Sequence, residues 1–220
     1  MGKNMGDEIS LDVGELFAEL GIQLRQNVKV ALIVLALLVG GNLLIDQLGS
    51  KSSVYATGIL EIAVQLYVMR AALEKAGLLP DNSKAKLGAF WWMGLISTLA
   101  IMIGCVLLIL PGLYLAARWF LSGPVLIAEE KSAVESLRES WRLTRGSVWQ
   151  LVGATLVLFG GGLAVAVVPF IVLPQSAQGV SLNAVAYIVM FGAYICGWLM
   201  EVGAYGMVTN RHGALAEVFA

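Results

Sequence analysis

The fold of this chain is decided by the uncharged stretch 148-VWQLVGATLVLFGGGLAVAVVPFIV-172. In a helix that rises about 1.5 Å per residue, this run is long enough to cross the roughly 30 Å hydrocarbon core of a bilayer. Because lipid offers no partners to backbone N–H and C=O groups, the run must be helical. The composition agrees, since the 220 residues are 59% hydrophobic and 13% charged, against roughly 45–50% and 25% in soluble chains. The sequence therefore predicts an all-α integral membrane protein.

Windows of about 19 residues identify six candidate membrane spans. They are Val28–Ile45, Val54–Lys75, Leu87–Leu110, Leu113–Ala128, Val148–Val172 and Leu182–Val208. We therefore predict a polytopic bundle of six transmembrane helices over residues 28–208. A cytoplasmic amphipathic segment at 1–27 precedes the bundle, and a cytoplasmic tail at 209–220 follows it.

The positive charges predict the orientation. All of the chain's 14 Lys and Arg residues except Lys51 and Arg118 lie in four segments, at residues 1–29, 70–88, 129–147 and 209–220. By the positive-inside rule, these segments are cytoplasmic, and an even number of spans fits this distribution. The near balance of 14 basic and 15 acidic residues leaves no electrostatic basis for binding nucleic acid.

A short amphipathic helix is predicted at Ser132–Arg145. It begins with a capping box formed by Ser132 and Glu135, and its apolar face includes Leu137 and Trp141. We expect it to lie in the cytoplasmic interface with these two side chains toward the apolar layer. Its polar face carries a candidate contact site for anionic lipid headgroups, although positive-inside topology explains the same residues: Arg138, Arg142 and Arg145.

A second amphipathic segment, Val13–Arg25, has an acidic polar face and is expected to pack beneath the bundle. A shift of 120 residues aligns 15–45 with 135–165 without a gap, including the glycine pairs at 40–41 and 160–161. Two interpretations are open. In the first, the segments are copies of a parallel repeat like those in some transporters. In the second, the similarity is the one that any two amphipathic helices leading into a membrane span share.

One part of the chain resembles a known family. The stretch 109-ILPGLYLAARW-119 is followed by Gly123-Pro124 and by 136-SLRESWRLTRG-146. This order of a Pro-Gly turn, a short span with an Arg and a cytoplasmic helix resembles the bacterial glycerophosphodiester phosphodiesterase membrane-domain family and the related YciC-like inner-membrane family. The resemblance implies a multi-pass inner-membrane location. Named members fuse this membrane domain to a soluble phosphodiesterase domain, which this sequence does not contain, so the resemblance implies no catalytic activity.

Ionisable side chains inside the spans are candidates for function, because each costs about 2.5–3.5 kcal/mol on insertion scales unless it is paired or hydrated. Counted at 1.5 Å per residue from the outer ends of their spans, Glu61 lies about 10 Å deep and Arg118 about 8 Å deep. We therefore expect the two side chains to pair inside the bundle. This pair is either a structural lock or, with Gln65, a binding site in which Arg118 holds an anion or a lipid headgroup. Arg70 and Glu201, nearer the cytoplasmic side, are a candidate structural ion pair.

The fifth span contains three consecutive glycines, Gly160, Gly161 and Gly162. They are either a local helix break that lines a cavity or small residues that let two helices approach closely. We favour close packing.

The sequence shows no nucleophile-and-base pair, phosphate-binding loop or metal motif, and it has one His and two Cys. We therefore expect no enzymatic activity, metal or cofactor. The leading hypothesis is a lipid-associated or accessory inner-membrane protein that organises lipids, a protein partner or a second copy of itself. The alternative is a small transporter or channel for an anionic or lipid-derived molecule, with its site near Glu61, Arg118 and the three glycines. A water-accessible cavity that reaches Arg118 would favour transport, and a dry packed core would favour the accessory role.

Overall fold

The computed structural model describes residues 11–48, 53–80, 87–174 and 179–218, and within these ranges it contains helices and no strand. This confirms the prediction of an all-α fold. The elements are, in chain order, α1 (Val13–Leu48), α2 (Ser53–Lys75), α3 (Leu87–Leu107), α4 (Ile109–Arg118), α5 (Ser122–Ala128), α6 (Ala133–Leu143), α7 (Val148–Thr155), the π-helical segment η1 (Leu156–Gly160), α8 (Gly161–Val172) and α9 (Val180–Val218).

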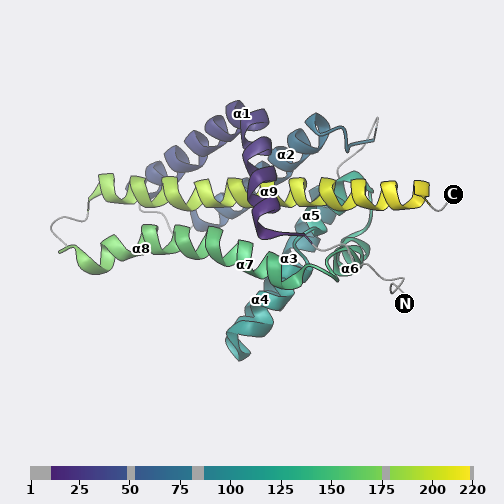
Figure 1. Cartoon of the computed structure of the whole chain (residues 1–220). Helices are drawn as coiled ribbons and strands as arrows, with labels where there is room; N and C mark the ends of the chain where they lie inside the picture. Colours follow the sequence, from purple (N-terminus) through teal and green to yellow (C-terminus); the bar gives the residue numbers. More distant parts are fainter. Residues whose placement is uncertain (1–10, 49–52, 81–86, 175–178, 219–220) are drawn as a thin grey trace.

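Helix α9 runs through the middle of the molecule, between α1 and α2 on one side and α7 and α8 on the other (Figure 1). The core forms where these helices meet, and fully buried side chains there include Leu16, Met69, Leu199 and Met200. The helix α9 continues to Val218, well beyond the predicted end of the sixth span, so most of the predicted tail is helical.

Five segments are long and apolar enough to cross a membrane: α1, α3, α4 with α5, α7 with η1 and α8, and α9. The predicted second span, Val54–Lys75, forms helix α2 of 23 residues but does not belong to this set. Its charged side chains, Glu61, Arg70, Glu74 and Lys75, lower its mean hydropathy. The membrane class is therefore confirmed, whereas the second span, and with it the total of six, stays a prediction.

The predicted amphipathic segment 13–25 and the first span form one continuous helix, α1. Figure 1 shows the start of α1, in purple, running in a different direction from its later, blue-violet part. Leu16 and Leu20 of the early part are buried, as expected for a segment that packs beneath the bundle. In the aligned segment 135–165 the helix is instead interrupted between α6 and α7. The interruption falls at Gly146, and glycine is a poor helix former.

Two long-range contacts mark opposite ends of the bundle. At one end, Arg211 of α9 forms an ion pair with Glu15 of α1 at 2.7 Å. At the other end, the Tyr187 hydroxyl donates a hydrogen bond to Asp46 at 2.8 Å. The start of α1 and the late part of α9 thus lie at the same end of the bundle.

Helices α3 and α4 pack as a tight hairpin whose turn is at Leu108. The sequence predicted this turn at Pro111-Gly112, and that prediction is wrong. Pro111 lies in the first turn of α4, where its missing N–H removes no helical hydrogen bond. Gly112 is a contact point, because a Cβ added there would lie 2.1 Å from the Sγ of Cys105 and 2.7 Å from its backbone nitrogen.

The fifth predicted span has the bounds that the structure shows, Val148–Val172, but it is not a regular helix. Its middle, Leu156–Gly160, is π-helical. A π-helical turn contains an extra residue and changes the direction of the side chains around it, and such turns are frequent at functional sites. The irregularity that was the less favoured alternative for the glycines therefore lies over Leu156–Gly160, and it includes only the first of them.

The packing of the hairpin predicts opposite effects for two glycine substitutions. Gly112→Ala should lower the stability by about 2 kcal/mol, because the added methyl group overlaps the backbone of α3 as well as a side chain. The matched control is Gly161→Ala, which also lies in a helix but has no atom within 4 Å of the added Cβ. It should stabilise slightly, by about 0.5–1 kcal/mol. Thermal unfolding of the purified protein in detergent measures both, and equal shifts would contradict the hairpin geometry.

Candidate functional site

The predicted ion pair between Glu61 and Arg118 is not formed. Glu61 lines a small cavity of about 80 Å³ beside Asn42 of α1 and Phe191 of α9. Arg118 ends helix α4 and is 6% exposed. None of the ion pairs among the described residues joins the two. Equal depth in the membrane therefore did not bring these side chains together.

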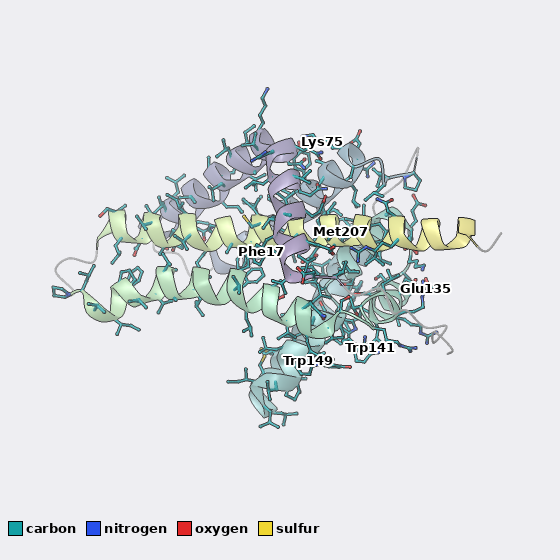
Figure 2. All side chains as sticks on the ribbon, in the orientation of Figure 1. Phe17, Lys75, Glu135, Trp141, Trp149 and Met207 are labelled. Carbon is teal, nitrogen blue, oxygen red and sulfur yellow. The ribbon has the colours of Figure 1, made fainter. Side chains whose placement is uncertain are left out.

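The guanidinium group of Arg118 lies instead against aromatic rings. Its central carbon is 4.5 Å from the ring centroid of Trp141 and 5.6 Å from that of Tyr114, a cation–π geometry. Trp141 lies on α6 (Figure 2). The prediction that Leu137 and Trp141 face the lipid is wrong, because Leu137 is buried and Trp141 packs on Arg118. The apolar face of α6 is thus docked on the bundle.

The backbone of Arg118 is also held by α6. The Ser140 hydroxyl donates a hydrogen bond to the Arg118 carbonyl oxygen at 2.9 Å, and the Thr144 hydroxyl lies 3.1 Å from the same oxygen. The Leu121 N–H donates to the Ser140 hydroxyl at 3.1 Å. Since α4 ends at Arg118 and α5 begins at Ser122, these hydroxyl groups satisfy backbone groups that the break between the two helices leaves without helical partners.

Next to this break lies a cavity of about 250 Å³, walled by α2, α3, α4, α5, α7, η1 and α9. It brings together two residues that the sequence singled out separately, Gln65 and Glu201. None of the ion pairs found in the described ranges joins Glu201 to its predicted partner Arg70. Four hydroxyl side chains complete the polar part of the lining: Ser97, Thr98, Ser122 and Thr155.

The π-helical segment shapes one wall of this cavity. Phe159 lines it, and its ring occupies the space beside Gly197, where an added Cβ would lie 2.6 Å from the ring. The Oγ1 atom of Thr155, one residue before η1, is buried without a hydrogen-bond partner among the described residues. The three glycines at 160–162 are not among the lining residues. A Cβ added to Gly162 would lie 3.1 Å from the Cβ of Ala193, so this glycine lies close to α9, whereas the other two face open space.

Sequence reasoning missed the hydroxyl residues of the cavity for a physical reason. A serine in a helix can satisfy itself by donating to a backbone carbonyl one turn earlier. Ser97 donates to the Gly94 carbonyl at 3.0 Å, and Ser122 donates to the Trp119 carbonyl at 2.7 Å. A serine in an apolar run therefore does not indicate a cavity. Thr155 differs from these serines because its hydroxyl is buried without a hydrogen-bond partner among the described residues, and only the folded structure shows this.

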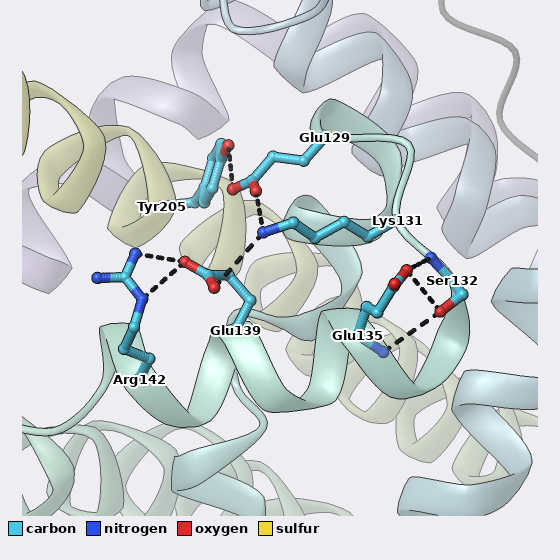
Figure 3. Close-up of polar contacts among 7 residues, drawn as sticks. All are labelled: Glu129, Lys131, Ser132, Glu135, Glu139, Arg142 and Tyr205. Atoms are coloured by element: carbon cyan, nitrogen blue, oxygen red, sulfur yellow. Dashed lines mark hydrogen bonds and ion pairs between the residues drawn. The ribbon is translucent and has the colours of Figure 1, made fainter.

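The polar face of α6 carries a network of charges (Figure 3). Lys131 lies 2.6 Å from Glu129 and 3.4 Å from Glu139, and Arg142 pairs with Glu139. The hydrogen bond from Arg142 holds the pKa of Glu139 below its usual value near 4.5. The predicted capping box is confirmed, since Ser132 and Glu135 exchange hydrogen bonds at the start of the helix (Figure 3).

The three arginines of the predicted lipid-contact site thus differ in their surroundings. All three side chains are exposed, and Arg142 in addition pairs with Glu139. Trp149, four residues after Arg145, is 71% exposed on α7 (Figure 2). An exposed tryptophan beside arginines is typical of the membrane–water interface.

Comparison with known proteins gives one match. A family model described as the membrane domain of glycerophosphoryl diester phosphodiesterase matches residues 83–217, more than half of the chain. It covers α3 to α9 with the cavity walls that they form and the contacts between Arg118 and α6. Searches of curated proteins and of solved structures found no significant match.

The stacking of Arg118 on Trp141 predicts that the two residues are energetically coupled. In a double-mutant cycle of Arg118→Met and Trp141→Leu, the coupling free energy should be about 1–2 kcal/mol, because the cation–π contact is buried. The control cycle combines Arg118→Met with Glu61→Gln and should be additive within about 0.5 kcal/mol. Thermal unfolding in detergent measures both cycles. Coupling only in the control cycle would contradict the geometry and restore the pair expected from the sequence.

The lowered pKa of Glu139 predicts a loss of stability in acid. A carboxyl group whose pKa is lower in the folded state stabilises the fold above its unfolded pKa, and this contribution disappears as the pH falls through the folded value. The unfolding temperature should therefore decrease as the pH falls below about 4.5. In Glu139→Gln the decrease should be smaller, because no carboxylate is left for Arg142. An identical pH profile in both proteins would show that the network does not contribute.

Proposed function

Because the chain belongs to the family of membrane domains of glycerophosphoryl diester phosphodiesterases, we propose that it is a non-enzymatic membrane module. In this proposal it is a lipid-associated accessory component of a bacterial inner membrane that organises lipids or a partner protein around it. The matched family describes the membrane part of those proteins and not their phosphodiesterase part, which supports a role without catalysis.

The observation that carries the proposal is the closed environment of Arg118. A transporter for an anionic molecule would need this residue, the most deeply buried cation in the described part of the chain, to face a path for its cargo. The guanidinium group is instead covered by Trp141 and Tyr114. Arg118 does not line the 250 Å³ cavity that its neighbours Trp119 and Phe120 line. This favours the accessory role over the transporter.

The surface supports association with lipid. At the turn of the α3–α4 hairpin, consecutive apolar side chains face outward, from Val106 at 81% exposed to Leu110 at 70% exposed. Such a tip is stable only in hydrocarbon or against a partner. At the opposite, cytoplasmic side of the proposed topology, Arg138, Arg145 and Trp149 form a surface suited to anionic headgroups.

The proposal predicts selective retention of anionic lipids. The protein, purified in a mild detergent, should carry phosphatidylglycerol or cardiolipin in preference to zwitterionic lipid, as counted by native mass spectrometry. Arg138→Gln combined with Arg145→Gln should weaken this retention about tenfold or more, since each interfacial cation contributes about 1 kcal/mol.

Two controls make this test specific. Arg25→Gln combined with Lys29→Gln removes the same charge from exposed positions on α1 and should have a smaller effect. If both double variants lost anionic lipid equally, the retention would depend on the net charge of the protein and not on the arginines of α6. Hydrolysis of a glycerophosphodiester by the purified protein, lost on a point substitution in the chain, would overturn the non-enzymatic role.

A further inference from the structure

The cavity beside the break between α4 and α5 contains a carboxylate without a described counter-charge. Glu201 lines it from α9, beside α5, where a Cβ added to Gly123 would lie 3.4 Å from its Oε2 atom. In the described ranges no Lys or Arg forms an ion pair with Glu201. A carboxyl group that helices partly enclose is ionised only where a positive charge or hydrogen-bond donors offset the loss of water.

Aromatic rings form much of the remaining wall. Four of them line the cavity, from α3, from the α4–α5 break and from η1: Phe90, Trp119, Phe120 and Phe159. Aromatic faces attract cations, and aromatic walls with one carboxylate are the combination that recognises organic ammonium groups. A divalent metal ion would instead require several oxygen ligands close together, and an uncharged ligand would leave the carboxylate without an opposite charge.

The size of the cavity agrees with a small ligand. Its volume of about 250 Å³ corresponds to roughly eight water molecules at about 30 Å³ each. This is enough for an ammonium group with a few carbon atoms. Gln65 and the unpartnered hydroxyl of Thr155 supply hydrogen-bonding groups for a polar substituent on that ligand.

We propose that this cavity binds a small organic ammonium group, with Glu201 as its counter-ion and the aromatic wall around its alkyl substituents. The cation supplies the positive charge that the Glu201 carboxylate lacks. Phe159 of η1 and Thr155, the residue before η1, line the cavity around it. This site is separate from Arg118 and from the arginines of α6, so it stands independently of the proposed function.

The ammonium group has two possible sources, a free amine or the headgroup of a membrane lipid. Thr98, at the edge of the cavity, is exposed on α3, on a helix that is long and apolar enough to span the membrane. An opening on that side would face lipid. The chemistry recognised in the cavity is the same for both sources, and the experiment separates them.

The first test compares two ligands on the unmodified protein in detergent. Choline should raise the unfolding temperature and shift the tryptophan emission, because Trp119 lines the cavity. Its uncharged analogue, in which carbon replaces the quaternary nitrogen, should do neither. The emission shift should vanish in Trp119→Phe while the thermal shift persists. Equal effects of the two ligands, or no effect of choline or ethanolamine, would overturn the proposal.

The second test uses a matched pair of substitutions. Glu201→Gln keeps the size of the side chain and removes its charge, and it should weaken choline binding about tenfold or more, because the attraction between the carboxylate and the quaternary nitrogen is lost. Glu61→Gln makes the same change in the separate 80 Å³ cavity and should leave binding unchanged. Retained affinity in Glu201→Gln would exclude Glu201 as the counter-ion. The ligand comparison on the unmodified protein decides the proposal even where this variant does not fold.

The third test identifies the source. In nanodiscs of phosphatidylglycerol alone, choline should bind as in detergent. Addition of phosphatidylethanolamine should suppress the choline signal if a lipid headgroup occupies the cavity, and should leave it unchanged if the ligand is a free amine. Both results agree with an ammonium site, and absence of the signal in phosphatidylglycerol nanodiscs would contradict it.

Discussion

The hydrogen bonds from α6 to the carbonyl oxygen of Arg118 are the constraint on which this structure depends. A helix can be interrupted within an apolar segment only where other groups satisfy the freed backbone. Ser140 and Thr144 do this, and the stacking of Trp141 on the guanidinium holds the same two helices together. Because the chain can then turn between α4 and α5, the residues of the turn become cavity walls.

The sequence predicted well those features that depend on local chemistry. The uncharged run 148–172 predicted its own helical bounds, because the bilayer rules out other backbone conformations for it. The Ser132/Glu135 capping box predicted the start of α6, since its hydrogen bonds link residues only three positions apart. The stretch from Ser136 to Gly146 pointed to the family that the comparison found. Within this stretch, Ser140, Trp141 and Thr144 contact Arg118 at the break between α4 and α5.

Features that depend on rotation about a helix axis were not predictable from one sequence. Depth placed Glu61 beside Arg118, but depth fixes one coordinate, and the two side chains point to different neighbours. The same ambiguity affected α6, where amphipathicity predicted an apolar face but did not say whether lipid or protein covers it. Pro111-Gly112 suggested a turn because both residues are common in turns. Here Gly112 serves close packing with α3 instead.

The two half-buried carboxylates show why a charge inside the membrane region has to be interpreted with its surroundings. Glu61 lies in a space of about 80 Å³, which leaves room for little more than two water molecules at about 30 Å³ each. Glu201 faces a cavity of about 250 Å³ with four aromatic rings and several hydrogen-bonding groups. That larger space exists because η1 redirects Phe159 and because the α4–α5 break redirects Trp119 and Phe120. Since Ser140 and Trp141 of α6 hold Arg118 and Leu121 at this break, α6 also fixes the part of the chain that carries Trp119 and Phe120 into the cavity wall.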